Sequence, residues 1–278
     1  GTVRAVGSRH SSSGILESDD VIVDAKSLAG IRSYDNEKRE AWVGAGTTLK
    51  ELGAGLLERR LGFHNYGDVD VQTIAGAIGT GTHGSGVKLQ NLATMLIGAR
   101  LVTGTGESIE LGIEEDPDAI RGLRVSLGAL GILTSIRLKL VDAYQLHRRE
   151  WCSTFEPALA GFDELAAKCR NVDLYWYPRS DEVKLRTLDE PGRVPGRIPY
   201  ARLKFEEQGW AADILPRTRK LRFEEIEYAV PAAAGPACMK EVRDRVKARH
   251  RRHVAWRVLY RTVAADDAYL STAHAQDV

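Results

Sequence analysis

A glycine-dense segment constrains the fold of this chain more than any other feature of the sequence. Five of the eleven residues at 76–86 are glycine, and most of the others are small. Because glycine carries no side chain, a flat ligand or a phosphate group can lie directly against such a backbone. The segment therefore predicts either a loop that approaches a ligand or a tightly packed glycine loop.

Gly79, Gly81 and Gly84 satisfy the G-x-G-x-x-G spacing of dinucleotide-binding folds. That spacing is informative only between a strand and a long helix, with an acidic residue about 20 positions further on. The sequence predicts no strand before the segment and no long helix after it, and a Gly-Thr-Gly turn at 104–106 stands where the acidic residue is needed. A Rossmann-type NAD-dependent enzyme, with a parallel sheet and a helix starting near Gly81, therefore stays a minor alternative.

A second loop of small residues follows a predicted strand at residues 2–6. It runs from Gly7 to Gly14 and consists mainly of glycine and serine around His10. Successive backbone amides in such a loop can cradle a phosphate, and a neutral imidazole is a competent nucleophile at physiological pH. Taken alone, the loop is still more typical of a solvated turn that happens to contain a histidine.

The remaining pattern predicts an α+β chain in which the arrangement of strands and helices changes near residue 142. The first part has a capping box formed by Thr48 and Glu51 at the start of a helix. Its strands are predicted at 21–23, 41–45, 94–103, 108–111 and 132–140. The second part is predicted to contain helices at 156–170 and 235–249 and strands at 174–177, 183–186 and 255–262. We therefore expect one domain at 1–142 and another at 143–278.

Composition excludes several classes of protein. The formal net charge of +1 argues against a nucleic-acid partner, and no apolar run is long enough for a membrane span. The three cysteines, Cys152, Cys169 and Cys238, are far apart and form no C-x-x-C pair, so we expect no metal site and no disulfide framework. A reducing, cytoplasmic location fits this cysteine content. The basic stretch at 240–253 leaves peripheral membrane association as a minor possibility.

Several segments, taken together in order, resemble one known family. They are residues 3–11, 67–76, 80–86, 126–132 and 261–267. This combination resembles the vanillyl-alcohol-oxidase-type (PCMH-type) FAD-binding proteins, in the branch of L-gulonolactone, D-arabinono-1,4-lactone and alditol oxidases. The resemblance implies an FAD-binding domain of two mixed α/β subdomains at 1–142 and an α+β cap domain that contacts substrate at 143–278. It also implies further family segments before Gly1 and after Val278, and the sequence does not tell why they are absent.

The same resemblance assigns roles to individual residues. His10 matches the histidine that carries FAD covalently through the flavin 8α-methyl carbon, and Arg261 matches a substrate-binding, catalytic arginine of the cap. The matched FAD contacts are Ala5, Val6, Gly7, Ser8, Arg9, His10, Ser11, Asp68, Thr73, Gly76, Thr80, Gly81, Thr82, His83 and Ile132. The implied reaction is hydride transfer from a CH–OH carbon of a sugar lactone or polyol to flavin N5, after which oxygen or another acceptor reoxidises the flavin.

Two positions bear on the details of this reaction. The family usually has Glu-x-Arg where this chain has Leu259-Tyr260-Arg261, and leucine cannot accept a hydrogen bond. The substrate is then less polyhydroxylated than a sugar lactone, or the chain is a catalytically impaired flavin-binding paralogue. Gly67 matches a position beside the flavin where a small residue leaves room for dioxygen, which favours an oxidase over a dehydrogenase. The exact substrate and the oligomeric state stay open.

Overall fold

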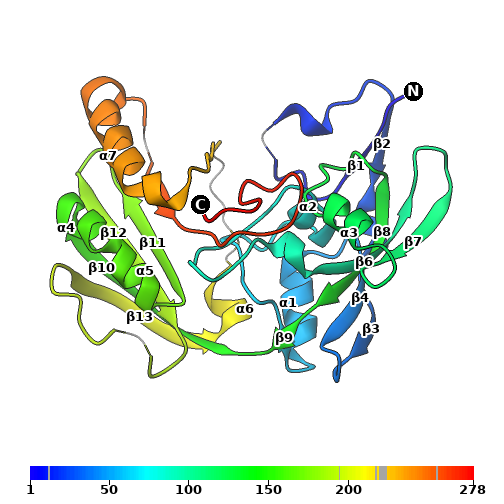
Figure 1. The fold of residues 1–278 in the computed structure, drawn as a ribbon, viewed down its shortest axis with the longest axis horizontal. Helices are drawn as coiled ribbons and strands as arrows, with labels where there is room; N and C mark the ends of the chain where they lie inside the picture. Colours follow the sequence, from blue (N-terminus) through cyan, green and yellow to red (C-terminus); the bar gives the residue numbers. More distant parts are fainter. Residues whose placement is uncertain (12, 194, 217, 219–223, 255) are drawn as a thin grey trace.

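Two five-stranded antiparallel sheets organise the molecule (Figure 1). The computed structural model describes residues 1–11, 13–193, 195–216, 218, 224–254 and 256–278. The first sheet has the order β3-β4-β8-β6-β7. Its strands are β3 (Ile31–Asp35), β4 (Glu40–Gly44), β6 (Leu96–Val102), β7 (Ser108–Gly112) and β8 (Ile132–Lys139). All of its pairings are antiparallel, so the alternative of a parallel dinucleotide-binding sheet is wrong.

Short helices cover the first sheet and complete its core. They are α1 (Leu49–Leu57), α2 (Ile74–Gly79) and α3 (Pro117–Leu123), with 3₁₀ turns at Gly14–Leu16, Ala25–Leu28 and Leu92–Met95. The predicted capping box is confirmed, since the Glu51 N–H donates to Thr48 Oγ1 at 3.2 Å and the Thr48 N–H donates to Glu51 Oε2 at 3.0 Å. Helical spacing then places Leu52 and Leu56 of α1 in the core, where both are fully buried.

Two further sheets in this half of the chain have two strands each. Parallel strands β1 (Val3–Val6) and β2 (Val21–Asp24) flank the loop that contains His10. Strands β5 (Leu61–Gly62) and β9 (Val141–Asp142) form an antiparallel pair near the point where the chain leaves the first sheet. The parallel pair fixes both ends of the His10 loop at one edge of the structure.

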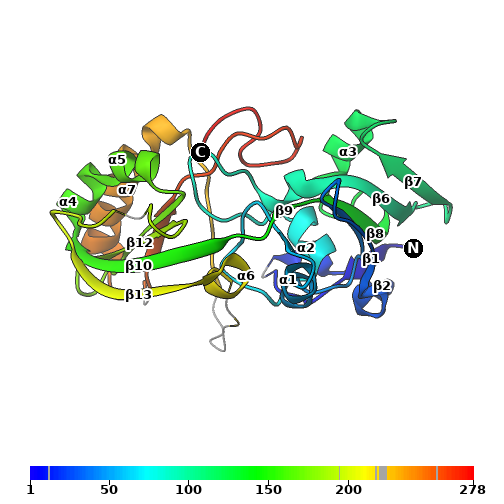
Figure 2. The ribbon, with the colours of Figure 1, turned by 90° about the horizontal axis from the view of Figure 1, so that it is seen from below.

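The second sheet has the order β13-β10-β12-β11-β14. Its strands are β10 (Gln145–Thr154), β11 (Asn171–Trp176), β12 (Glu182–Asp189), β13 (Arg202–Trp210) and β14 (Val258–Arg261). Helices α4 (Phe155–Ala160), α5 (Phe162–Lys168) and α7 (Gly235–Arg245) lie along one face of this sheet (Figure 2), and two further turns at Ala232–Ala234 and Val246–His250 flank α7. Trp176 and Leu174 pack into the core of this face. The expected α+β class is confirmed.

The C-terminal segment connects the second sheet to the glycine-dense segment. After β14 the chain runs across the middle of the molecule (Figure 1), and the Gly86 N–H donates to the Thr262 carbonyl at 2.8 Å. The Ala264 N–H donates to the Leu89 carbonyl at 3.1 Å. Residues that follow Arg261 therefore fix the end of the glycine-dense segment directly.

The two halves share part of one core. The short helix α6 (Ala211–Ile214) belongs to the later part of the chain, yet Ala211 and Ile214 pack into the core of the first sheet. Leu146 of β10 packs there as well. The division after residue 142 stays a prediction. The part of the chain that the structure describes contains no helix of the length and apolarity that crossing a bilayer requires.

Candidate functional site

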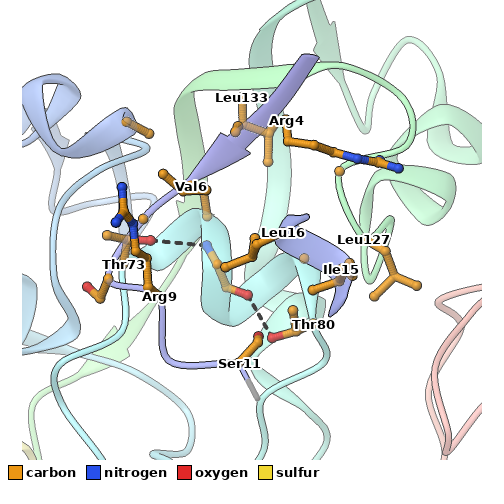
Figure 3. Close-up of a pocket in the computed structure, with 18 of the residues that line it drawn as sticks. Arg4, Val6, Arg9, Ser11, Ile15, Leu16, Thr73, Thr80, Leu127 and Leu133 are labelled. Atoms are coloured by element: carbon orange, nitrogen blue, oxygen red, sulfur yellow. Dashed lines mark hydrogen bonds between the residues drawn. The ribbon is translucent and has the colours of Figure 1, made fainter. Parts of the chain in front are cut away.

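The loop after β1 and the glycine-dense segment border one pocket (Figure 3). The empty space that these residues border is about 990 Å³ and includes open solvent, so the pocket is an open cleft. The predicted cofactor contacts that line it are Ala5, Val6, Gly7, Ser8, Arg9, His10, Ser11, Thr73, Gly76 and Thr80. Residues 126–128 complete the wall opposite the His10 loop. The structure thus brings together two segments that are more than sixty residues apart in the sequence.

Close contact between Gly7 and Thr73 sets the position of the His10 loop. A Cβ atom at position 7 would lie 2.1 Å from Thr73 Oγ1, so this approach requires glycine. Thr73 also caps α2, because its Oγ1 accepts from the Gly76 N–H at 3.4 Å, and the Thr80 hydroxyl donates to the Gly76 carbonyl at 2.8 Å (Figure 3). One threonine therefore orders both the helix and the loop packed on it.

The lining of the pocket fits a polar, partly flat ligand. A Cβ atom at Gly79 or Gly128 would meet no heavy atom within 4 Å, so both positions present bare backbone to the open space. Two buried polar atoms of the lining, Arg4 Nε and Gln72 Oε1, have no hydrogen-bond partner among the described residues. Buried polar atoms are normally hydrogen-bonded, and one donor with one acceptor here suits a ligand that carries both kinds of group. The donor set of Arg4, backbone amides and hydroxyls suits the pyrophosphate of a dinucleotide such as FAD.

Five predicted cofactor contacts do not line this pocket. They are Asp68, Gly81, Thr82, His83 and Ile132. Thr82 is linked to the lining, because its Oγ1 accepts from Gln72 Nε2 at 2.9 Å. Gly81 has a φ of +67°, a left-handed conformation that favours glycine. The roles of these five residues stay predictions.

A second group of polar residues lies where the glycine-dense segment meets β14. Glu227 Oε1 is 3.0 Å from Arg261 Nη2 and 3.3 Å from His83 Nε2. Arg261 Nη1 donates to the His83 carbonyl at 3.4 Å, and His83 Nδ1 lies 2.9 Å from the Gly84 carbonyl. Arg261 and His83, which the sequence assigned separately to substrate and cofactor, are therefore neighbours.

Charges in this group perturb one another. Partial burial acts to raise the pKa of Glu227, but the hydrogen bond from His83 and the charge of Arg261 hold that pKa well below its usual range. Burial acts to lower the pKa of Arg261, yet the nearby carboxylates, Glu227 first among them, raise it. Both groups are thus charged at neutral pH, and they form an ion pair with 3.0 Å between Glu227 Oε1 and Arg261 Nη2.

An ion cluster continues from this group along the second sheet. Arg186 donates to Asp173 Oδ2 at 2.8 Å and to Asp68 Oδ1 at 2.7 Å, and the Tyr175 hydroxyl lies 3.4 Å from Asp68 Oδ2. Asp173 and Arg186 are both buried. Burial is also the main cause of a raised pKa at Tyr175, whose hydroxyl therefore stays protonated. Through its contact with Arg186, Asp68 connects the segment that precedes the glycine-dense segment to the second sheet.

Strand alternation explains why these side chains gather. Side chains two residues apart share a face, so Asp173 and Tyr175 of β11 face the same way as Arg261 of β14, which is in register with Asp173. Leu174 and Trp176 face the helices instead. One face of the sheet is therefore apolar and covered, and the other is charged and directed toward Asp68.

Sequence reasoning missed Asp173, Arg186 and Glu227. Asp173 and Arg186 are partners in register on adjacent antiparallel strands, so an opposite-charge pair was the available signal once both strands had been aligned. Glu227 had no such signal, because it lies outside any described strand or helix. Only its contacts across long sequence separations place it at the site.

Comparisons with known proteins agree with this geometry. A family profile described as "FAD binding domain" matches residues 1–112, and one described as "D-arabinono-1,4-lactone oxidase" matches residues 196–278. The chain is 32% identical over 312 residues to L-gulono-1,4-lactone dehydrogenase of Mycobacterium tuberculosis, covering 99% of this chain and 72% of that protein. It is 30% identical over 193 residues to L-gulonolactone oxidase of Mus musculus, covering 69% of this chain and 44% of that protein.

Solved structures with a similar fold include two oxidases. Glucooligosaccharide oxidase from Acremonium strictum aligns with a TM-score of 0.63 at 15% identity, over 75% of this chain and 48% of that one. Cholesterol oxidase from B. sterolicum aligns with a TM-score of 0.61 at 18% identity, over 68% of this chain and 40% of that one. At these identities the likeness concerns the fold, and it agrees with the expected PCMH-type FAD-binding architecture with its cap.

Proposed function

The chain belongs to the family of FAD-dependent aldonolactone oxidoreductases, and on that premise we propose that it oxidises a CH–OH group of a sugar-derived lactone or alditol. The observation that carries the proposal is the pocket shared by the His10 loop and the segment from Thr73 to Thr80. FAD, when bound, supplies the ring that accepts a hydride from the substrate carbon. The residues of the chain would bind FAD and substrate, orient them toward each other and polarise the substrate oxygen.

Binding of FAD is assigned to two parts of the pocket. The backbone of residues 7–9 and the hydroxyls of Ser8 and Ser11 would hold the pyrophosphate, and bare backbone at Gly79 and Gly128 would admit the flat parts of the molecule. His10 lines the same pocket and is exposed, so its ring nitrogens are accessible to a cofactor bound there. We assign His10 as the covalent attachment residue.

Binding of substrate is assigned to the polar face of the second sheet. Arg261 carries a fixed positive charge that would hydrogen-bond the substrate oxygen and stabilise negative charge developing on it. Its contact with the His83 carbonyl orients it toward the glycine-dense segment. Substrate would thus lie between a cationic side chain of the sheet and the flavin-binding half of the molecule.

Oxygen is the proposed electron acceptor, with another acceptor as the alternative. A Cβ atom at Gly67 would lie 3.1 Å from Thr82 Cγ2, a tight contact, and 3.6 Å from the His83 carbonyl, so only glycine keeps this small space clear of a side chain. Among the similar proteins, some are named dehydrogenases and others are named oxidases. We further propose a cytoplasmic location, which the three free cysteines favour.

Mass spectrometry of the purified protein tests the flavin assignment. We expect yellow protein whose intact mass after denaturing chromatography exceeds the chain mass by one covalently bound FAD. His10→Ala should lose that added mass, whereas His250→Ala, at an exposed histidine beyond α7, should keep it. A chain that never carries FAD, attached or free, would overturn the proposal.

Steady-state assays with a panel of lactones and alditols test the reaction. We expect turnover of at least one of them by the flavin-loaded protein, with either oxygen or a dye as acceptor. A flavin-loaded protein that stays inactive throughout would instead establish the catalytically impaired paralogue.

A further inference from the structure

The Glu227 carboxylate contacts the polar group at β14, although its segment is exposed and its own side chain is 55% exposed. Its neighbours Ile226 and Tyr228 are 78% and 81% exposed, and no strand or helix is present at residues 224–230. The Glu227 carboxylate nevertheless contacts His83, 144 positions earlier in the sequence, and Arg261, 34 positions later. Nothing in the local pattern of the segment requires this contact, so it has to be explained by the residues it meets.

The two carboxylate oxygens of Glu227 are used unequally. Oε1 accepts from Arg261 Nε at 3.3 Å and Arg261 Nη2 at 3.0 Å, and it also faces His83 Nε2. Oε2 accepts from Arg261 Nη2 alone among the described contacts, at 3.0 Å. A carboxylate offers about four acceptor directions, and this side chain is 55% exposed. Oε2 therefore retains room for a further donor on the solvent side of Arg261.

Other acids near Arg261 are already engaged. Asp68 and Asp173 both influence the charge of Arg261, and both are hydrogen-bonded to Arg186. Position 259, on the same face of β14 as Arg261, is a leucine that can accept no hydrogen bond. The strand that carries Arg261 thus contributes no carboxylate beside it, and the 224–230 segment contributes one.

We propose that Glu227 is the specificity-determining carboxylate of this site: Oε1 holds Arg261 and His83 in place, and Oε2 accepts a hydroxyl of a polyhydroxylated substrate. This inference rests on the function proposed above and names the group that selects the substrate. It assigns to the 224–230 segment the acceptor that β14 lacks at Leu259. The substrate class it favours has a hydroxyl next to the carbon that is oxidised, as in a sugar lactone.

The test compares two substrates in three variants. L-Gulono-1,4-lactone is compared with α-hydroxy-γ-butyrolactone, which keeps one ring hydroxyl and lacks the others. Glu227→Gln should lower kcat/KM for the first by roughly tenfold to a hundredfold, the range expected for a lost hydrogen bond to a charged group, with a smaller loss for the second. The matched control Glu225→Gln, at an exposed acid of the same segment, should leave both unchanged.

A second carboxylate should rescue the variant. Adding Leu259→Glu to Glu227→Gln places an acid on the same face of β14 as Arg261, and we expect most of the selectivity to return. Equal losses for both substrates, or full selectivity in Glu227→Gln, would overturn the inference. The 2-deoxy analogue of L-gulono-1,4-lactone cannot be oxidised, so its binding, monitored by the flavin absorbance, gives a readout without turnover. The dissociation constant of this analogue should rise in Glu227→Gln and fall again in the double variant.

Failures of the two proposals are distinguishable. A wild-type protein that oxidises neither lactones nor alditols contradicts the proposed function. A wild-type protein that is active, with a Glu227→Gln variant of unchanged selectivity, contradicts only the inference on Glu227. If Glu227→Gln fails to fold, Glu227→Asp keeps the charge on a shorter side chain, and it should show the same loss of selectivity toward L-gulono-1,4-lactone.

Discussion

Arg186 Nη2 lies 2.7 Å from Asp68 Oδ1 and so joins the second sheet to the segment that precedes the glycine-dense segment. The same guanidinium pairs with Asp173, which is fully buried. Burial acts to lower the pKa of Arg186, but the Asp173 and Asp68 carboxylates raise it well above its usual value. One cation thus pairs with two acids at the place where the two halves of the molecule meet.

Removing this cation should destabilise the protein strongly. In Arg186→Met the Asp173 carboxylate would stay buried without its charge partner, and breaking a buried pair in this way costs about 3–5 kcal/mol. We expect a fall of that size in the free energy of unfolding, measured by urea denaturation. Arg193→Met is the matched control, because Arg193 is exposed and pairs only at 3.6 Å with Glu190. A loss below about 1 kcal/mol in Arg186→Met would show that the cluster is not essential to stability.

The contact between Gly7 and Thr73 predicts a second effect. A Cβ at position 7 would lie 2.1 Å from Thr73 Oγ1 and 2.9 Å from its Cγ2, so Gly7→Ala must displace the loop. We expect a cost of about 1–3 kcal/mol and less bound flavin, measured by unfolding and by absorbance of the purified protein. Adding Thr73→Ala removes both clashing atoms and should partly restore flavin content. Gly104→Ala, where a Cβ meets nothing within 4 Å, should change neither quantity.

Sequence reasoning succeeded where a local pattern carries the information. The capping box at Thr48 and the strand that contains Trp42 follow from side-chain chemistry and alternation, and both are confirmed. The predicted start of the last strand at Ala255 lies outside the described residues, and the described strand begins at Val258. The helix α2 was not predicted, because its glycines disfavour a helix; Thr73 caps it and its position in the core stabilises it.

Strands β10 and β13 were missed for a different reason. Residues 147–150 carry four consecutive charged or titratable side chains, which is typical of a loop. In the structure Arg148 pairs with Glu207 of β13 at 3.2 Å and Lys184 of β12 pairs with Glu150 at 3.1 Å. The charges are therefore satisfied across strands, and no single-segment pattern reveals such partners. Glu227 was missed for the same reason, whereas the loops around His10 and Thr80 were found because a family resemblance linked them.

Filling the space at Gly67 should slow the reaction of the reduced flavin with oxygen. In Gly67→Ala the added methyl group would lie 3.1 Å from Thr82 Cγ2 and fill the space proposed for oxygen. We expect the rate of flavin reoxidation by oxygen to fall about tenfold, equivalent to about 1.4 kcal/mol of barrier, while reduction of an artificial dye stays near the wild-type rate. Stopped-flow mixing of substrate-reduced protein with oxygen measures the first rate. Equal reoxidation by oxygen in both proteins would mean that oxygen reaches the flavin by another route.

The ion group of Glu227 predicts a pH-dependent contribution to stability. The pKa of Glu227 is lower in the folded protein than its ordinary value of about 4.3, so the ionised form stabilises the fold. This stabilisation is fully present above the ordinary value and is lost as the pH falls toward the lowered folded-state value. Because the side chain is 55% exposed, solvent screens the pair, and we expect only about 0.5–1 kcal/mol at neutral pH.

Thermal unfolding of wild type and Glu227→Gln across a pH series measures this contribution. The difference in Tm should be largest from about pH 5 upward and should shrink as the pH falls below about 4, because the wild-type carboxylate then gains a proton and comes to resemble the glutamine. Added salt should reduce the difference at neutral pH, since exposed charges are screened. Glu225→Gln, at an exposed acid of the same segment, should give a difference near zero at every pH. A difference for Glu227→Gln that stays constant down to about pH 3 would show that the side chain acts by packing, and the electrostatic anchoring of Arg261 would have to be abandoned.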